Sequence, residues 1–586
     1  MNYPMLKEIP TSRETVDVFK GYNHNLRIGE GEFFDMENMT GDYYPTLSPR
    51  KKRGVYASPS NPQGLISKDN LCYVDGTKFV MNGYPIEGIE LSTDEDDCPK
   101  QLISMGAYVI ILPDKKYINT LDVTDLGNIE ASFETNSDVT FELCGLDGEM
   151  YSGATVSETE PEDPENLDLW IDTSSTPHTL KKYSATSSMW VDIPTTYIKI
   201  SSTGIGKAFK QYDGVTISGV LSEDLKDLNS SMVIMECGDD YIVVIGILDE
   251  VSAQLHEDGA IKLERKMPNM DFVIESENRL WGCRYGVAAN GDVVNEIYAS
   301  KLGDFKNWNC FMGLSTDSYA ATVGTDGQFT GAITHLGYPL FFKENCVHKV
   351  YGNYPANFQI QTTTCRGVQR GCERSLAIVN EILYYKARHA VCGYDGSLPT
   401  EISYALGEEK YSEATAGAHG NKYYISMKDA AGKHNLFVYD TAKGTWHKED
   451  DLWADCFCSC REELYCIEHN SKKIIAMHGS GTQDTGKVEW MVQTGVIGTS
   501  MPDVKYISRL LVRMSMEIGS KVRFFAQYDS MGEWEHLGTV SGTSLRSFML
   551  PIKAKRCDHM RLRIEGIGDV KIFSITKTIE QGSDIT

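Results

Sequence analysis

Short stretches in which hydrophobic and polar residues alternate recur along most of the chain. Examples are NKYYISMK at residues 421–428, ELYCIEH at 463–469 and KKIIAMH at 472–478. Alternation with a period of two places successive side chains on opposite faces of a β-strand. Gly, Asn and Asp separate the stretches, as is typical of hairpin turns. No segment in the middle of the chain keeps a helical spacing for three turns, so the pattern predicts an all-β protein.

The strand-like stretches also form a repeat. Each unit contains one or two hairpins, and neighbouring units lie roughly 40 residues apart, which is typical of β-propeller blades. A four-stranded blade cannot bury both faces alone, so blades stack around an axis, and we expect Trp281, Tyr384, Tyr424 and Phe437 to lie between them. An irregular double β-sandwich is the alternative. The repeating units are Asn278–Gly286, Gly331–Gly352, Arg374–Gly396, Ala416–Trp446 and Trp453–His478.

A similar strand-like stretch occurs near the N-terminus, NLCYVDGTKFVMNG at Asn70–Gly83. The sequence therefore predicts a propeller in two parts, residues 54–124 and residues 204–495. At roughly 40–50 residues per blade, these parts supply about seven or eight blades.

The residues between the two propeller parts, 125–203, differ in composition. An acidic, proline-bearing linker precedes three short strand-like pieces, which include Trp170 and Trp190. Insertions of this kind are tolerated at exposed loop tips. We predict a small inserted β module here, with Trp170 and Trp190 as interaction residues.

The two ends of the chain differ from the propeller. Residues 496–586 contain long, cleanly alternating stretches such as KVRFFAQYD and HMRLRIEG, whose polar positions carry Arg, Gln and Glu. Strands with one solvent-exposed face and one buried face are typical of a sandwich, so we predict a C-terminal β-sandwich or jelly-roll-like domain. Residues 1–53 are predicted to form an extended N-terminal arm.

The charge of the chain restricts its partners. Against 56 Lys and Arg stand 82 Asp and Glu, which gives a formal net charge of -26. An acidic surface repels phosphate, so general nucleic-acid binding is not expected. No run of 18 apolar residues predicts a membrane span, and the first residues lack the apolar run of a signal peptide. We expect the protein to fold in a cytoplasm.

Catalytic motifs are absent from the sequence: it contains no GxSxG, HExxH, GxxxxGK[ST] or helix-opening GxGxxG. The most metal-like cluster is Cys456-Phe-Cys-Ser-Cys460, but strand alternation does not converge its sulfurs as a zinc knuckle would. The sequence therefore predicts no catalytic residues, no cofactor and no metal, and a protein that is not an enzyme.

One basic cluster stands out in this acidic chain. Arg50, Lys51, Lys52 and Arg53 follow the segment GDYYPTLSP, whose prolines favour an extended path. A basic segment of this kind suits docking on the acidic face of a neighbouring molecule, and this is our prediction for the four residues. Pairing within the domain and contact with nucleic acid are the alternatives.

The opening FKGYNHNLRIGEGEFFDMENMTGDYYPTLSPRKKRG (Phe19–Gly54) resembles the start of virion proteins of tailed bacteriophages and prophages. Its GYN element leads into an acidic E-F-x-D-M-x-N phrase and then P-x-L-x-x-R-x-x-R. The tail nozzle, or tail tubular protein B, of short-tailed phages is the best-known relative. The segment DLWIDTSSTPHTLKKYSATSSMWVDI also resembles a small module common in phage tail and baseplate proteins.

The resemblance implies a structural tail component located in the virion and assembled in the bacterial cytoplasm. It implies a closed homo-oligomeric ring that forms part of the genome-ejection channel. The ring would dock to head-tail adaptor and fibre proteins, and DNA would pass its acidic lumen without sequence-specific binding. Two alternatives stay open: a tail protein that binds host-surface glycans, and a propeller-type glycoside hydrolase.

Overall fold

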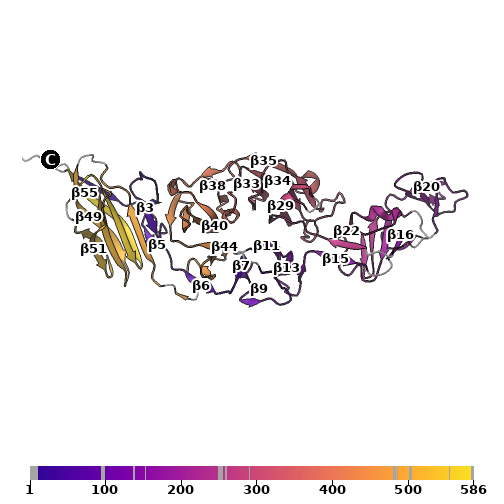
Figure 1. The fold of residues 1–586 in the computed structure, drawn as a ribbon, viewed down its shortest axis with the longest axis horizontal. Coiled ribbons are helices and arrows are strands. Elements are labelled where there is room, and N and C mark those ends of the chain that lie inside the picture. Colours follow the sequence, from indigo (N-terminus) through magenta and orange to yellow (C-terminus); the bar gives the residue numbers. More distant parts are fainter. Residues whose placement is uncertain are drawn as a thin grey trace, which may run out of the picture. The chain divides into compact units, whose positions relative to one another are not determined.

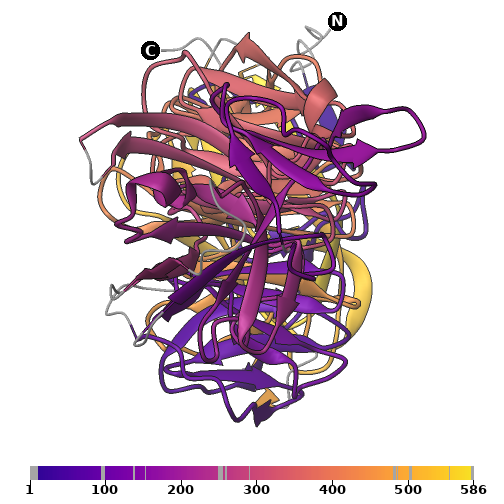
Figure 2. The same cartoon turned by 90° about the vertical axis from the view of Figure 1, so that its right-hand side faces the viewer.

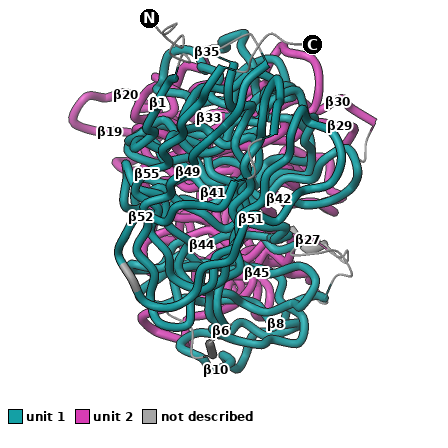
Figure 3. The backbone as a smooth tube through the Cα atoms, turned by 90° about the vertical axis from the view of Figure 1, so that its left-hand side faces the viewer, with its two compact units in different colours: residues 1–100, 341–347, 362–586 teal, residues 101–340, 348–361 magenta. Residues whose placement is uncertain are grey.

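A computed structural model shows an all-β protein, with 52% of residues in strands and 3% in helices, which confirms the prediction of an all-β chain. Its sheets are many and small (Figure 1). The chain divides into two compact units, residues 1–100, 341–347 and 362–586, and residues 101–340 and 348–361 (Figure 3). The structure describes residues 11–93, 99–135, 139–151, 153–248, 255–257, 261–288, 291–479, 483–484, 486–499, 504–552 and 555–581.

Four antiparallel sheets in the first unit follow the predicted repeat. Three of them are simple meanders, in which each strand pairs with the next one along the chain. Their strands are β7 (Pro62–Ser67), β8 (Leu71–Asp75), β9 (Lys78–Met81) and β10 (Tyr84–Pro85); β36 (Ala377–Val379), β37 (Ile382–Lys386), β38 (Val391–Tyr394) and β39 (Thr400–Glu401); and β40 (Ser412–His419), β41 (Lys422–Lys428), β42 (His434–Asp440) and β43 (Thr445–Lys448).

The fourth of these sheets joins two distant parts of the sequence. It contains β44 (Ala454–Cys460), β45 (Glu463–Glu468) and β46 (Ile474–Ala476), followed by β6 (Gly54–Ala57) and β47 (Gln483–Asp484). Val55 pairs with Ile475 and Gly54 with Ala476. A strand from the front of the chain therefore completes the last sheet of the repeat.

These sheets pack face to face. Tyr384 of β37 lies 5.4 Å from Tyr423 of β41, measured between ring centroids. Tyr424 packs in one cluster with Leu464 of the next sheet. Leu71 of β8 packs with Tyr465 of that same sheet. The central strands are consequently buried on both faces, and β41 contains five consecutive buried residues.

A two-layered β-sandwich in the same unit uses both ends of the chain. Its strands alternate between buried and exposed residues, as predicted: in β49, Val512 and Met514 are buried and Arg513 is exposed. One sheet contains β1 (Thr11–Val16), β55 (Val570–Gln581), β49 (Lys505–Met516), β52 (Ser544–Leu550) and β53 (Arg556–Cys557). The other contains β2 (Gly21–Tyr22), β3 (Glu32–Glu37), β48 (Glu489–Thr494), β54 (Met560–Ile567), β50 (Lys521–Tyr528) and β51 (Glu535–Ser541).

The segment predicted to be an extended arm is thus largely built into sheets. β1 pairs with β55 from Thr11 opposite Glu580 to Val16 opposite Ile575. β3 pairs with β48. The small ribbon of β4 (Met39–Thr40) and β5 (Ser48–Pro49) follows. The alternation in TSRETV is visible in the sequence, but its partner lies at the other end of the chain.

The second unit contains two meander sheets of the repeat, and a third carries residues of both units. Figure 2 draws residues 101–340, which make up most of this unit, in purple to pink. Phe305 packs with Tyr117 between the two meander sheets of this unit. Trp281 packs edge-on against Phe358, with ring centroids 5.0 Å apart. The strands are β11 (Gln101–Met105), β12 (Tyr108–Leu112), β13 (Lys116–Asn119) and β14 (Leu126–Asn128); β28 (Phe272–Ser276), β29 (Arg279–Val287), β30 (Val293–Ala299) and β31 (Tyr319–Thr322); and β32 (Gly331–His335), β33 (Tyr338–Lys343), β34 (Cys346–Tyr351) and β35 (Gln359–Thr364).

Three further sheets lie between β14 and β28 in the sequence and share one hydrophobic core. The strands at residues 197–265 pair with those at 131–144, so sheets cross the boundary that the sequence placed between residues 203 and 204. The strands are β15 (Ala131–Glu134), β16 (Val139–Cys144), β17 (Thr155–Ser157), β18 (Leu169–Asp172), β19 (Thr179–Ser184), β20 (Met189–Asp192), β21 (Tyr197–Ser201), β22 (Gly214–Ser218), β23 (Ser231–Val233), β24 (Glu236–Gly238), β25 (Tyr241–Ile245), β26 (Leu255–Glu257) and β27 (Lys262–Arg265).

Helical structure is limited to short 3-10 turns in the described part of the chain: Glu223–Leu228, Pro355–Asn357, Glu373–Ser375 and Tyr404–Leu406. No helix among the described residues is long and apolar enough to cross a membrane.

Candidate functional site

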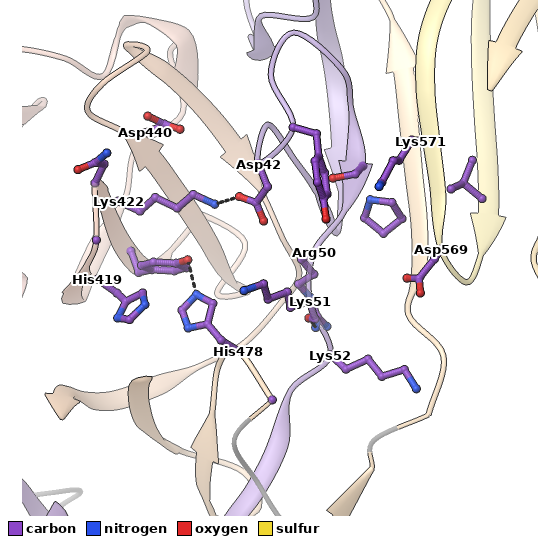
Figure 4. Close-up of a pocket in the computed structure, with 18 of the residues that line it drawn as sticks. Asp42, Arg50, Lys51, Lys52, His419, Lys422, Asp440, His478, Asp569 and Lys571 are labelled. Atoms are coloured by element: carbon purple, nitrogen blue, oxygen red, sulfur yellow. Dashed lines mark hydrogen bonds and ion pairs between the residues drawn. The ribbon is translucent and has the colours of Figure 1, made fainter. Parts of the chain in front are cut away.

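The first unit contains an open cleft of about 890 Å³, which we call the basic cleft (Figure 4). Six segments that are distant in sequence form its walls. They are the segment around β4 and β5, the β40–β41 turn, the end of β42, the residues after β46, the end of β49 and the start of β55. The residues used below are Asp42, Tyr43, Arg50, Lys51, Lys52, His419, Asn421, Lys422, Asp440, Lys443, His478, Glu517, Asp569 and Lys571.

Turn geometry places many of these side chains. His419 ends β40 and Lys422 begins β41, and Gly420 between them has a φ of +56°, a conformation that glycine adopts without strain. The hairpin therefore presents His419, Asn421 and Lys422 together at its tip.

Two ion pairs fix the wall formed by the hairpin. Lys422 donates to the carboxylate of Asp42, and Lys443 donates to Asp440 at 2.8 Å. Burial raises the pKa of the Asp42 carboxyl, but the Lys422 ammonium outweighs burial, and the net shift of the pKa is downward. Asp42 therefore stays ionised at neutral pH.

A hydrogen-bonded chain of three side chains lies behind this wall. Glu463 accepts a hydrogen bond of 3.0 Å from Nδ1 of His478, and Tyr424 donates to Nε2 of the same ring at 3.0 Å. We assign the proton of His478 to Nδ1 because an ionised carboxylate can only accept. Burial raises the pKa of Tyr424 well above its ordinary value, so its hydroxyl keeps its proton.

His419 lies against this chain, with its ring centroid 4.4 Å from that of His478. Burial lowers the pKa of His419, and His478 lowers it further. The His419 imidazole is therefore neutral at pH 7. Both rings offer polar nitrogens and flat faces to the cleft.

Cationic side chains lie along the opposite side of the cleft. Lys51 and Lys52 are exposed, and in Figure 4 Lys51 extends toward His478. Lys571 holds its ammonium group 4.0 Å from the centre of the Tyr43 ring. The lining as a whole contains six Lys and Arg side chains and four carboxylates. In a chain of net charge -26, this is a local excess of positive charge.

The structure separates the four residues of the predicted basic cluster. Arg53 is buried and binds Asp450 at 2.7 Å and Glu449 at 2.8 Å. Arg50 binds Asp450 at 3.2 Å and donates to Asn38. Pairing within the chain, one of the alternatives, therefore describes both arginines, whereas Lys51 and Lys52 face the cleft.

The two predicted tryptophans meet in the second unit. The Trp170 and Trp190 rings pack edge-on at 5.5 Å, and Lys181 lies 4.6 Å above the Trp170 ring. Trp170 is buried and donates from its indole to the carbonyl of Ser157 at 3.0 Å, whereas Trp190 is half-buried on β20. Trp170 thus holds the small sheet together, and Trp190 keeps a solvent-accessible face.

The basic cleft can bind a polar ligand by charge and hydrogen bonds. Among the described residues, no three His, Cys, Asp or Glu side chains converge as metal ligands would. Most of its residues were missed by sequence reasoning, because they lie in or near turns of six separate segments. Apart from Lys51 and Lys52, the one sequence signal for the cleft was the pair of tyrosines in GDYYPTLSP, of which Tyr43 lines the cleft.

Searches for related proteins give structural similarity only. No protein-family model matches the chain, and no curated protein matches it. An exo-β-1,3-galactanase from Phanerochaete chrysosporium has 8% identity and a TM-score of 0.21 and covers 52% of this chain and 94% of its own. The endosialidase of phage phi92 has 9% identity and a TM-score of 0.21 and covers 75% and 68%. A Trypanosoma rangeli sialidase mutant has 8% identity and a TM-score of 0.17 and covers 90% and 95%.

These similarities correct one prediction. The sequence predicted that the protein is not an enzyme, and that prediction is wrong because the similar structures include glycoside hydrolases and sialidases. Lack of a catalytic motif is weak evidence in an all-β chain, since carboxylates from separate blades can converge without any local signature. TM-scores of this size assign no activity to this chain.

Proposed function

We propose that this protein is a component of a bacteriophage tail. Its specific role would be that of a ring-forming nozzle or tail tube protein that lines part of the genome-ejection channel. It would dock to head-tail adaptor and fibre proteins. The resemblance of residues 19–54 to phage virion proteins supports this role. In the virion, an acidic lumen would repel the phosphates of passing DNA.

The proposal includes a closed propeller. The described part of the chain contains seven sheets of the repeat, the last of which is completed by β6. We propose that they close into one seven-bladed β-propeller from residues 54–128 and 272–484. Residues 131–265 would be an insertion, and residues 11–49 and 489–581 would form the sandwich.

One observation carries the tail role: much of the segment with the phage resemblance is built into sheets. β2 and β3 add to one sheet of the sandwich, and Gly54 begins the strand that completes a sheet of the repeat. This segment is thus held by sheet hydrogen bonds. A rigid block of this kind suits a subunit that must bear load among identical copies.

The test is to find the protein in virions and to measure its assembly. Antibody labelling with negative-stain microscopy should mark one position on the tail, and mass photometry of the chain with its adaptor should give one closed oligomer. A protein missing from purified virions would contradict the tail role, and a monomer at every concentration with the adaptor present would contradict the ring.

The basic cleft favours a second candidate function, the binding or cleavage of a host-surface carbohydrate. Its volume lies within the range of small-molecule sites, roughly 300–1,000 Å³. It brings carboxylates, imidazoles and an exposed tyrosine together. A glycan array with purified protein, followed by a product-release assay on each glycan that binds, tests this function.

A further inference from the structure

We propose that the basic cleft binds an acidic saccharide, with Lys51 and Lys571 each positioned to contact a carboxylate or phosphate group of the ligand. This inference rests on the second candidate function, and it names the ligand class of that site. It does not depend on the tail role.

The first argument is the distribution of charge within the cleft. Lys422 and Lys443 already neutralise Asp42 and Asp440, and Arg50 is committed to Asp450. Lys51 and Lys571 have no carboxylate within ion-pair distance among the described residues. They are consequently two cations of the lining that can meet an oxyanion from outside.

The second argument concerns the position of these two lysines. Lys51 follows the β5 segment and extends toward the two histidines, while Lys571 begins β55 and lies over Tyr43 (Figure 4). An oxyanion bound by Lys51 would also lie near the His419 ring, because Lys51 is close enough to lower the pKa of that ring. Figure 4 shows the two lysine side chains extending in different directions, so each can bind an acidic group at a different part of the ligand.

The third argument is that the cleft also suits hydroxyl groups and sugar rings. Glu517 and Asp569 are exposed on its rim and can accept hydrogen bonds from hydroxyls. Asn421 can both donate and accept. Tyr43 is 57% exposed and offers an aromatic face to the apolar side of a sugar ring.

The same carboxylates disfavour a nucleic acid. A continuous row of phosphates would meet Glu517 and Asp569 as well as the overall charge of -26. A ligand with one or two oxyanions and several hydroxyls reduces this repulsion. The mixed lining therefore favours an acidic saccharide over a polyphosphate chain.

The experiment measures binding of matched trisaccharides to the full chain by calorimetry. The probes are maltotriose, trigalacturonate, phosphorylated maltotriose and inorganic phosphate. We expect at least one acidic trisaccharide to bind roughly tenfold or more tightly than maltotriose, and the double variant Lys51→Ala/Lys571→Ala to lose that preference. Lys433→Ala, an exposed lysine of the same unit, is the matched control and should change nothing.

A second readout does not depend on affinity alone. Binding of the acidic probe should shift the NMR signals of the His419 imidazole, and the double variant should abolish that shift at the same ligand concentration. Preference for carboxylate or for phosphate tells which oxyanion the site takes. Circular dichroism of each variant shows that the fold is retained.

The contrary outcomes are distinct. Equal binding of neutral and acidic trisaccharides overturns the acidic specificity but leaves carbohydrate binding standing. Inorganic phosphate binding as tightly as the phosphorylated sugar overturns the saccharide and leaves a simple anion site. No binding by any trisaccharide overturns both this inference and the carbohydrate function.

Discussion

Arg53 and Asp450 are separated by 397 positions in the sequence, yet Nη1 of Arg53 donates a hydrogen bond of 2.7 Å to Oδ2 of Asp450. A second nitrogen of the same guanidinium binds Glu449 at 2.8 Å. Burial acts to lower the pKa of Arg53, but the two carboxylates outweigh burial and raise it. The residue before β6 is thereby tied to the residues that follow β43.

Removing the Arg53 guanidinium should destabilise the first unit strongly. Arg53→Ala leaves Glu449 and Asp450 as buried carboxylates that have lost their main partner, and breaking such a pair typically costs about 3–5 kcal/mol. We expect a lower melting temperature and faster hydrogen exchange in β6 and β46. The neighbouring Lys52→Ala is the control, because Lys52 is exposed and should change stability by less than about 0.5 kcal/mol. Equal effects of the two variants would refute the structural role of Arg53.

The sequence predicted strands better than it predicted their partners. Short apolar runs bounded by turn residues located β41 and β45, because strands that are buried on both faces leave a nearly continuous hydrophobic run. The pairing of Val55 with Ile475 has no local signature, since it depends on closing a loop of more than 400 residues. The basic cleft was missed for the same reason, as turn residues are positioned by the sheets and not by a motif.

Protonation of a buried histidine should destabilise the protein in mild acid. His447 on β43 is 3% exposed, and burial, aided by Lys422, lowers its pKa from 6.5 to about 4. The unfolded chain therefore binds a proton at higher pH than the folded chain, and stability falls as the pH drops from about 6.5 to 4. The shift corresponds to about 3 kcal/mol across this window.

The measurement compares wild type with His447→Gln, which cannot gain that charge. Thermal unfolding at several pH values between 7.5 and 4 should show a steeper loss of stability in the wild type. Above pH 6.5 the difference between the two proteins should be constant. Parallel curves down to pH 4 would mean that His447 does not titrate as described.

A charge placed in β6 should open the sheet that this strand completes. Val55 packs against the cluster of Tyr424, Leu464 and Ile475, so Val55→Asp would bury a carboxylate without a partner. We expect a loss of about 2–4 kcal/mol and new protease cleavage near residues 54–57. Ser58→Asp adds the same charge at an exposed position and should leave the digestion pattern unchanged. If both variants resist the protease equally, β6 is not needed to hold the sheet.

The two tryptophans of the second unit should behave differently when truncated. Trp170→Ala removes a buried ring and the hydrogen bond to Ser157, so it should cost about 3–5 kcal/mol and disorder the sheet of β17–β20. Trp190 is half-buried on β20, so Trp190→Ala should cost less and leave the sheet folded. Hydrogen exchange over residues 155–192 distinguishes the two cases. Because Trp190→Ala keeps the module intact, a loss of partner binding in this variant would assign the contact to the exposed indole face, and unchanged binding would exclude it.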